Sequence, residues 1–96
     1  MLDEKKIRQA RDIFLKNVTW KKIYDDITPG ARRWYDLSFA FSDAEKVGLD
    51  KHEVSTAIDD YEALMSYDDL CSLLSHETNG YMRQKLKKLI VAAAER

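Results

Sequence analysis

Residues that interrupt helices are scarce in this chain, and they fall between stretches with helical spacing. The 96 residues include one proline and three glycines: Pro29, Gly30, Gly48 and Gly80. Residues with high helix propensity are plentiful, while the β-branched residues are scattered and form no alternating run. A chain of this size supports one buried core. We therefore expect a single all-α domain over residues 1–96, folded as a compact bundle of five or six helices.

Capping signals divide the chain into these helices. The apolar spacing predicts a helix over 3–17, and Thr19 caps a short second one. Thr28 followed by Pro29 starts a third helix that runs to about residue 47, with Gly48 as its stop. Asp50 and Ser66 cap two further helices, and residues 82–93 carry the last. The third helix is apolar on several sides, which is typical of the central helix of a bundle.

Apolar residues at helical spacing predict the core. The helix after Asp50 carries the best amphipathic stripe, formed by Val54, Ala57, Ile58, Tyr61, Leu64 and Met65. We expect seven side chains from four helices to be largely buried: Trp34, Phe41, Ile58, Tyr61, Leu73, Leu86 and Leu89. Tyr35 and Phe39 lie one turn apart on a different side of the third helix. They form either a contact patch for a partner or a second core face.

Charge is segregated along the sequence although the net charge is only −1. Residues 34–79 carry eleven acidic and two basic side chains, whereas residues 1–33 and 80–96 carry a net charge of +4 each. The basic ends either fold against the acidic middle or leave an acidic face exposed. No Lys or Arg lies within four residues of Asp59 or Asp60, on the side opposite the apolar stripe. We therefore predict an acidic face formed by Asp59, Asp60, Asp68 and Asp69.

Motifs for catalysis or metal binding are missing from the sequence. His52 and His76 fit no metal-ligand spacing, and Cys71 has no second cysteine. We expect no cofactor, no metal and no catalytic activity. The first residues are charged where a signal peptide is apolar, and the longest apolar run, 89–94, is too short to cross a bilayer. We expect a cytoplasmic chain that does not contact membranes.

These features predict a small non-catalytic module that binds a protein partner with a basic surface, as an inhibitor or regulator. Whether the chain is a monomer or a homodimer stays open. The alternative is a nucleic-acid-binding regulator. Residues 19–40 resemble a helix-turn-helix, with Arg32 and Arg33 near the start of its second helix. The basic residues of the last helix offer a second route to nucleic acid: Lys85, Lys87 and Lys88.

A third reading is a metal-dependent hydrolase. Asp59 and Glu62, three residues apart on one helix, form a pair that resembles the paired acids of the all-α nucleoside triphosphate pyrophosphohydrolases. That resemblance implies magnesium held by carboxylates from neighbouring helices. The sequence departs from the pattern at the second pair, because Asp68 and Asp69 are adjacent instead of one turn apart. The resemblance therefore covers only one of the two pairs.

Overall fold

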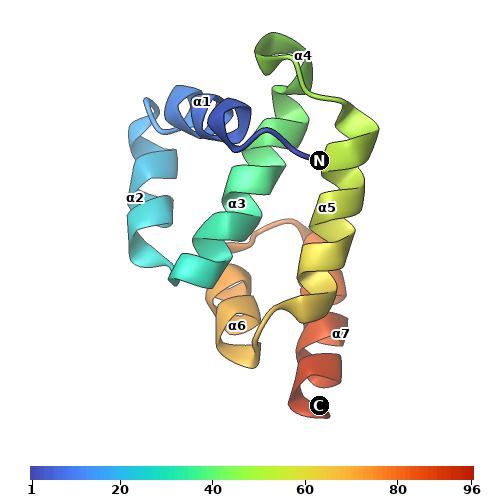
Figure 1. The fold of residues 1–96 in the computed structure, drawn as a ribbon. Coiled ribbons are helices and arrows are strands. Elements are labelled where there is room, and N and C mark those ends of the chain that lie inside the picture. The colour runs from blue at the N-terminus through green and yellow to red at the C-terminus, as the bar shows by residue number, and fades with distance from the viewer.

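The computed structural model describes residues 1–96 and contains seven helices and no strand (Figure 1). The helices are α1 (Glu4–Phe14), α2 (Val18–Asp26), α3 (Pro29–Ser42), α4 (Ala44–Val47), α5 (Lys51–Leu64), α6 (Tyr67–His76) and α7 (Gly80–Ala94). The all-α prediction is confirmed. The count exceeds five or six because the helix predicted over 28–47 is divided into α3 and α4. None of the seven combines the length and apolarity needed to cross a bilayer.

Helix α3 is the centre of the bundle, as its apolar sides predict. It packs against α1, α4, α5 and α6, and α7 packs against α6, behind the lower end of α5 in Figure 1. Its buried residues point to several sides: Ala31, Trp34, Tyr35, Leu37, Phe39 and Ala40. Helix α2 has no fully buried residue and lies at the edge of the bundle.

Two helix boundaries differ from the prediction, and each has a local cause. The first helix ends at Phe14 instead of Asn17, because the Asn17 side chain accepts the backbone N–H groups of Thr19 and Trp20 and so caps α2. The helix over 28–47 is interrupted at Asp43, whose φ and ψ of −106° and 20° are not helical. Gly48 ends α4 with a φ of 79°, as predicted for a C-terminal stop.

Three of the seven side chains predicted for the core are fully buried, and the other four are partly buried at its edge. Trp34, Leu73 and Leu86 are buried, while the other four predicted side chains are partly buried and pack against the core: Phe41, Ile58, Tyr61 and Leu89. The α5 stripe is wrong at one position, because Leu64 is 77% exposed. Glu62, two residues earlier, is 4% exposed and is the single charged residue in the interior.

The start of α3 is fastened to α6 by polar contacts. The Thr28 hydroxyl donates to Asp69 Oδ1 at 2.7 Å, and the Thr28 backbone N–H donates to Ser72 Oγ at 3.2 Å. The Tyr61 hydroxyl donates to the Gly30 carbonyl oxygen at 2.7 Å and ties α5 to the same turn. Gly30 leaves no room for a side chain, because a methyl group there would collide with the Asp69 carboxylate.

Two glycine substitutions test the contribution of these contacts between the start of α3 and α6. Gly30→Ala should force Asp69 away from Thr28 and lose a hydrogen bond to a charged group, worth about 1.5–3 kcal/mol. Gly80→Ala is the matched control, because nothing lies within 4 Å of the added methyl group. The control should be neutral or stabilising by up to about 1 kcal/mol. Equal unfolding free energies for the two variants in a denaturant melt would show that the contact between Thr28 and Asp69 does not stabilise the fold.

Candidate functional site

Three of the four predicted acidic-face residues are exposed and have no cationic partner. Asp59, Asp60 and Asp68 are solvent-exposed, and none of them forms an ion pair. Asp59 and Asp60 lie on the outer side of α5, opposite the buried Val54 and the buried Met65 that follows the helix. Their negative charge therefore faces solvent without local neutralisation.

Asp69 is wrong as a member of that free face. Its carboxylate accepts the Thr28 hydroxyl at 2.7 Å and lies against Gly30, inside the joint between α3 and α6. The sequence shows two adjacent carboxylates in the first turn of a helix, where both favour the dipole. It does not show which of them turns inward, because that depends on where Thr28 lies in the fold.

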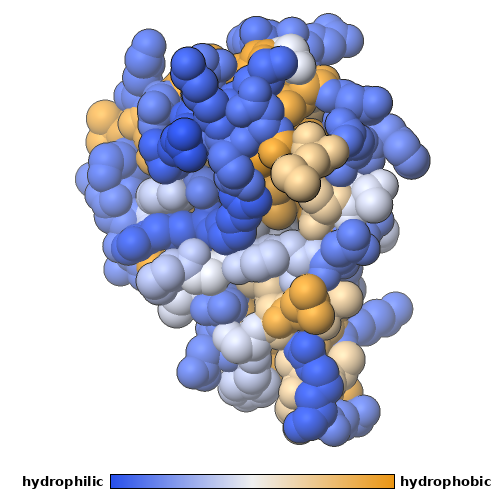
Figure 2. Space-filling model, in the orientation of Figure 1, coloured by the Kyte–Doolittle hydropathy of each residue, from blue (hydrophilic) through white to orange (hydrophobic).

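Two large exposed apolar side chains lie between the free carboxylates along the sequence. Leu64, at the end of α5, is 77% exposed, and Tyr67, at the start of α6, is 50% exposed. Asp60 and Leu64 are four residues apart and so share one side of α5. A two-residue turn connects Leu64 to Tyr67, and Asp68 follows. Figure 2 shows apolar surface over the lower end of α5. We call the group formed by Asp59, Asp60, Leu64, Tyr67 and Asp68 the α5–α6 surface.

Several other carboxylates of the acidic middle are engaged within the chain, two by cations and two by backbone N–H groups. Glu53 pairs with the amino group of Met1 at 3.3 Å, and the buried Glu62 pairs with Lys85 at 2.9 Å. Asp50 accepts backbone N–H groups of the first turn of α5, and Glu77 accepts those of the two residues after it. Self-neutralisation thus accounts for part of the acidic middle and leaves the α5–α6 surface charged.

The predicted aromatic patch is absent as an exposed surface, and the core alternative holds. Tyr35 and Phe39 are only 7% and 3% exposed. Their rings belong to a cluster in which Phe39 stacks on Phe14 at 4.5 Å, and Trp20 lies edge-on to Tyr35 and Phe39 at 5.9 Å and 5.6 Å. Sequence periodicity does not distinguish these outcomes, because a central helix and an interface helix both carry a second apolar side.

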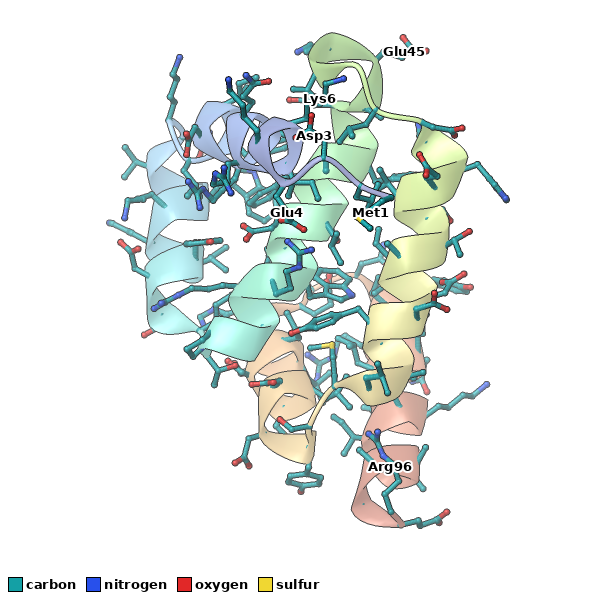
Figure 3. All side chains as sticks on the ribbon, viewed as in Figure 1. Met1, Asp3, Glu4, Lys6, Glu45 and Arg96 are labelled. Atoms are coloured by element: carbon teal, nitrogen blue, oxygen red, sulfur yellow. The ribbon has the colours of Figure 1, made fainter.

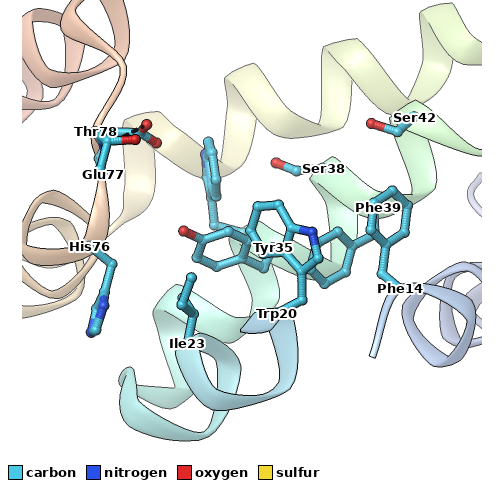
Figure 4. Close-up of a pocket in the computed structure, with 11 residues that line it drawn as sticks. Phe14, Trp20, Ile23, Tyr35, Ser38, Phe39, Ser42, His76, Glu77 and Thr78 are labelled. Carbon is cyan, nitrogen blue, oxygen red and sulfur yellow. Dashed lines mark hydrogen bonds between the residues drawn. The ribbon is translucent and has the colours of Figure 1, made fainter. Parts of the chain in front are cut away.

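A pocket opens beside this cluster, between α2, α3 and the turn from α6 to α7 (Figure 4). Its volume is about 320 Å³. One part of the lining is apolar and formed by Phe14, Trp20, Ile23, Trp34, Tyr35 and Phe39. The remainder is polar and formed by Ser38, Ser42, His76, Glu77 and Thr78. We call this hollow the aromatic pocket; its lining comes from four separate segments, so no single stretch of sequence indicates it.

Burial makes three tyrosines weaker acids. It raises the pKa of Tyr24, Tyr35 and Tyr61 above the ordinary 10.0, and the charge of Glu77 adds to the effect at Tyr35. The unfolded chain should therefore release these protons at a lower pH than the native one. The free energy of unfolding should be fully retained below pH 10 and fall as the pH rises further. Denaturant melts at about pH 9 and about pH 11 test this, with Tyr35→Phe reducing the fall; an unchanged free energy would contradict the burial.

The residues proposed for nucleic-acid binding are mostly engaged within the fold. Arg32 donates to the backbone oxygens of Tyr24 and Asp25 at the end of α2. The two terminal nitrogens of the Arg33 guanidinium donate to Glu4, and these hydrogen bonds hold the pKa of Glu4 below its ordinary value. Lys85 pairs with Glu62, so only Lys87 and Lys88 are exposed without a partner.

The helix-turn-helix reading also meets a geometric obstacle. Its second helix would be α3, which α1, α5 and α6 enclose. A recognition helix instead presents an exposed polar side to the groove. The short linker and its two flanking helices resemble the motif in sequence. Because α3 is buried among its neighbours, it serves as the central helix of the core and has no free side for a DNA groove.

The acidic pair proposed for magnesium does not converge on one site. Glu62 points into the protein, where its two oxygens accept the Trp34 indole N–H at 3.0 Å and the Lys85 ammonium at 2.9 Å. Asp59, one turn earlier on α5, is exposed to solvent. No group of three or more metal-ligating side chains is present. The paired-acid prediction is therefore wrong in its geometry.

The α5–α6 surface and the aromatic pocket are the two features whose chemistry the fold does not use internally. Both combine apolar and polar groups that solvent can reach. Their assignment rests on the residues of this chain alone. No protein-family model, no curated protein and no solved structure matches it.

Proposed function

We propose that this chain is a non-catalytic interaction module that binds a basic surface of another protein through the α5–α6 surface. One observation carries the proposal: Asp59, Asp60 and Asp68 are exposed and form no ion pair, and the two large apolar side chains between them in the sequence, Leu64 and Tyr67, are exposed as well. A surface of this kind meets two requirements of an interface, because charge steers the encounter and apolar contact holds the complex.

The sign of the charge narrows the class of partner. Carboxylates repel phosphate groups and attract lysine and arginine. A protein whose basic surface normally binds phosphates is therefore a suitable partner, because the α5–α6 surface could occupy that site. An inhibitor or regulator of such a protein is the role that follows. Tyr67 supplies an aromatic anchor, a residue type enriched where binding energy concentrates.

Charge reversal tests the proposal. The partner is first recovered by affinity capture with the wild-type chain. The double variant Asp59→Lys/Asp60→Lys should weaken its binding by at least about tenfold, and the wild-type affinity should fall with added salt. The matched control is Glu45→Lys/Asp25→Lys, which changes the net charge equally at exposed carboxylates on α4 and α2, away from the α5–α6 turn. Asp25 loses only an exposed ion pair with Lys21. Figure 3 shows Glu45 on α4, at the opposite end of α5 from the α5–α6 turn.

Both variants should keep the wild-type unfolding free energy within about half a kilocalorie per mole, because exposed charges contribute little to stability. If the Asp59/Asp60 variant binds the partner as tightly as the control does, the acidic surface is not the binding site. If both variants lose the partner equally, net charge alone accounts for the binding and the assigned surface is incorrect.

A further inference from the structure

The aromatic pocket contains polar groups that the fold leaves without partners. Every fully buried side-chain nitrogen and oxygen atom in the protein has a hydrogen-bond partner. Tyr35 is a buried residue, yet its hydroxyl forms no hydrogen bond within the chain, so this oxygen must reach open space. That space is the aromatic pocket, which Tyr35 lines together with Ser38 (Figure 4). The pocket therefore offers unused hydrogen-bonding groups beside aromatic rings.

Charge in the pocket is concentrated at one end. Glu77 lines it there, and its Oε1 accepts the backbone N–H groups of Thr78 and Asn79 while Oε2 accepts none. His76 lines the same end, and its Nε2 lies 3.0 Å from Asp26, which is outside the lining. Arg83, also outside the lining, donates to the Glu77 backbone oxygen at 2.9 Å and forms no hydrogen bond with the Glu77 carboxylate. No lysine or arginine lines the pocket. A cation is thus the charge that this end complements.

The opposite end suits an apolar group. Phe14, Trp20 and Phe39 form it, and their rings pack against one another at centroid distances of 4.5–6.4 Å. The volume of about 320 Å³ is at the lower end of the range for small-molecule pockets.

We propose that the aromatic pocket binds a small amphipathic amine, with its apolar body against Phe14, Trp20 and Phe39 and its protonated amino group near Tyr35 and Glu77. The Glu77 carboxylate accepts from the ammonium group, and the Tyr35 hydroxyl oxygen accepts a second N–H. The tyrosine hydroxyl is protonated at neutral pH, and burial and the Glu77 charge raise its pKa further above the ordinary 10.0. This site is separate from the α5–α6 surface, so failure of one proposal leaves the other untouched.

Three probes that share a phenylethyl group and differ in charge test the site on the full chain. They are 2-phenylethylamine, the neutral 2-phenylethanol and the anionic 3-phenylpropionate, each titrated into the ¹⁵N-labelled protein. The amine should shift the indole N–H signals of Trp20 and Trp34 saturably, with an affinity at least about tenfold above that of the alcohol. The anion should bind most weakly. Equal affinities for the three, or no saturable shift up to about 10 mM amine, would overturn the proposal.

Two variants locate the binding. Glu77→Gln should lower the amine affinity to about that of the alcohol and leave the alcohol affinity unchanged, whereas the matched Glu95→Gln should change neither. Ser38→Leu should fill the pocket and weaken all three probes; if this variant does not fold, Glu77→Gln decides alone. Unchanged amine affinity in Glu77→Gln would overturn the assigned orientation and with it the proposal.

Discussion

Leu86→Ala is expected to lower the free energy of unfolding by about 2–5 kcal/mol. Leu86 is 1% exposed and is the one fully buried residue of α7. Its removal leaves a cavity where α7 packs against the bundle, and the surrounding side chains can close that cavity only in part. A urea melt of the purified chain, followed by circular dichroism, measures the effect.

Leu64→Ala is the matched control for this substitution. It removes the same atoms from a side chain that is 77% exposed, so the unfolding free energy should change by less than about half a kilocalorie per mole. Similar losses in the two variants would show that α7 does not pack through Leu86 or that Leu64 lies in the core. Either result would contradict the fold described above.

Lys85→Met is expected to destabilise the protein by about 3 kcal/mol, because it leaves the Glu62 carboxylate buried without its cation. The Glu62 side chain is 4% exposed, and its remaining partner is the Trp34 indole N–H at 3.0 Å. Lys85 is itself 37% exposed, so its own desolvation adds little. Methionine keeps most of the apolar stem, which separates the loss of charge from the loss of packing.

A second substitution in the same background checks the cause. Adding Glu62→Gln should recover about half of the loss, because a neutral amide avoids the cost of a buried charge and still accepts from Trp34. Lys87→Met, on the exposed side of the same helix, should be nearly neutral. A Lys85→Met variant as stable as Lys87→Met would contradict the buried ion pair.

Apolar spacing and capping residues predict most of the fold. Asp50 and Ser66 cap α5 and α6 as expected, and α3 is central because its apolar residues point to several sides. The errors occur where a side chain has two equivalent choices. Asn17 caps α2 in place of Thr19, and Glu62 turns inward while Leu64 turns outward. Glu62 is held there by Trp34 and Lys85, 28 and 23 positions away in the sequence, so α5 alone does not indicate it.

The candidate sites also depend on contacts between residues that are distant in the sequence, which local patterns do not predict. The absence of local cations indicates correctly that Asp59 and Asp60 are exposed without partners. The spacing of Asp68 and Asp69 does not reveal that Thr28, about forty residues earlier, takes the second carboxylate. The aromatic pocket depends on the packing of α2 beside α3, a tertiary contact without a sequence motif.

Chemical-shift mapping of the complex tests most directly whether the α5–α6 surface is the binding site. The ¹⁵N-labelled chain is titrated with the partner recovered by affinity capture from the source cell, and backbone amide shifts are followed residue by residue. The largest shifts should lie within residues 59–68 and disappear in Asp59→Lys/Asp60→Lys. Shifts centred on Lys87 and Lys88, with residues 59–68 unchanged, would contradict the proposed function.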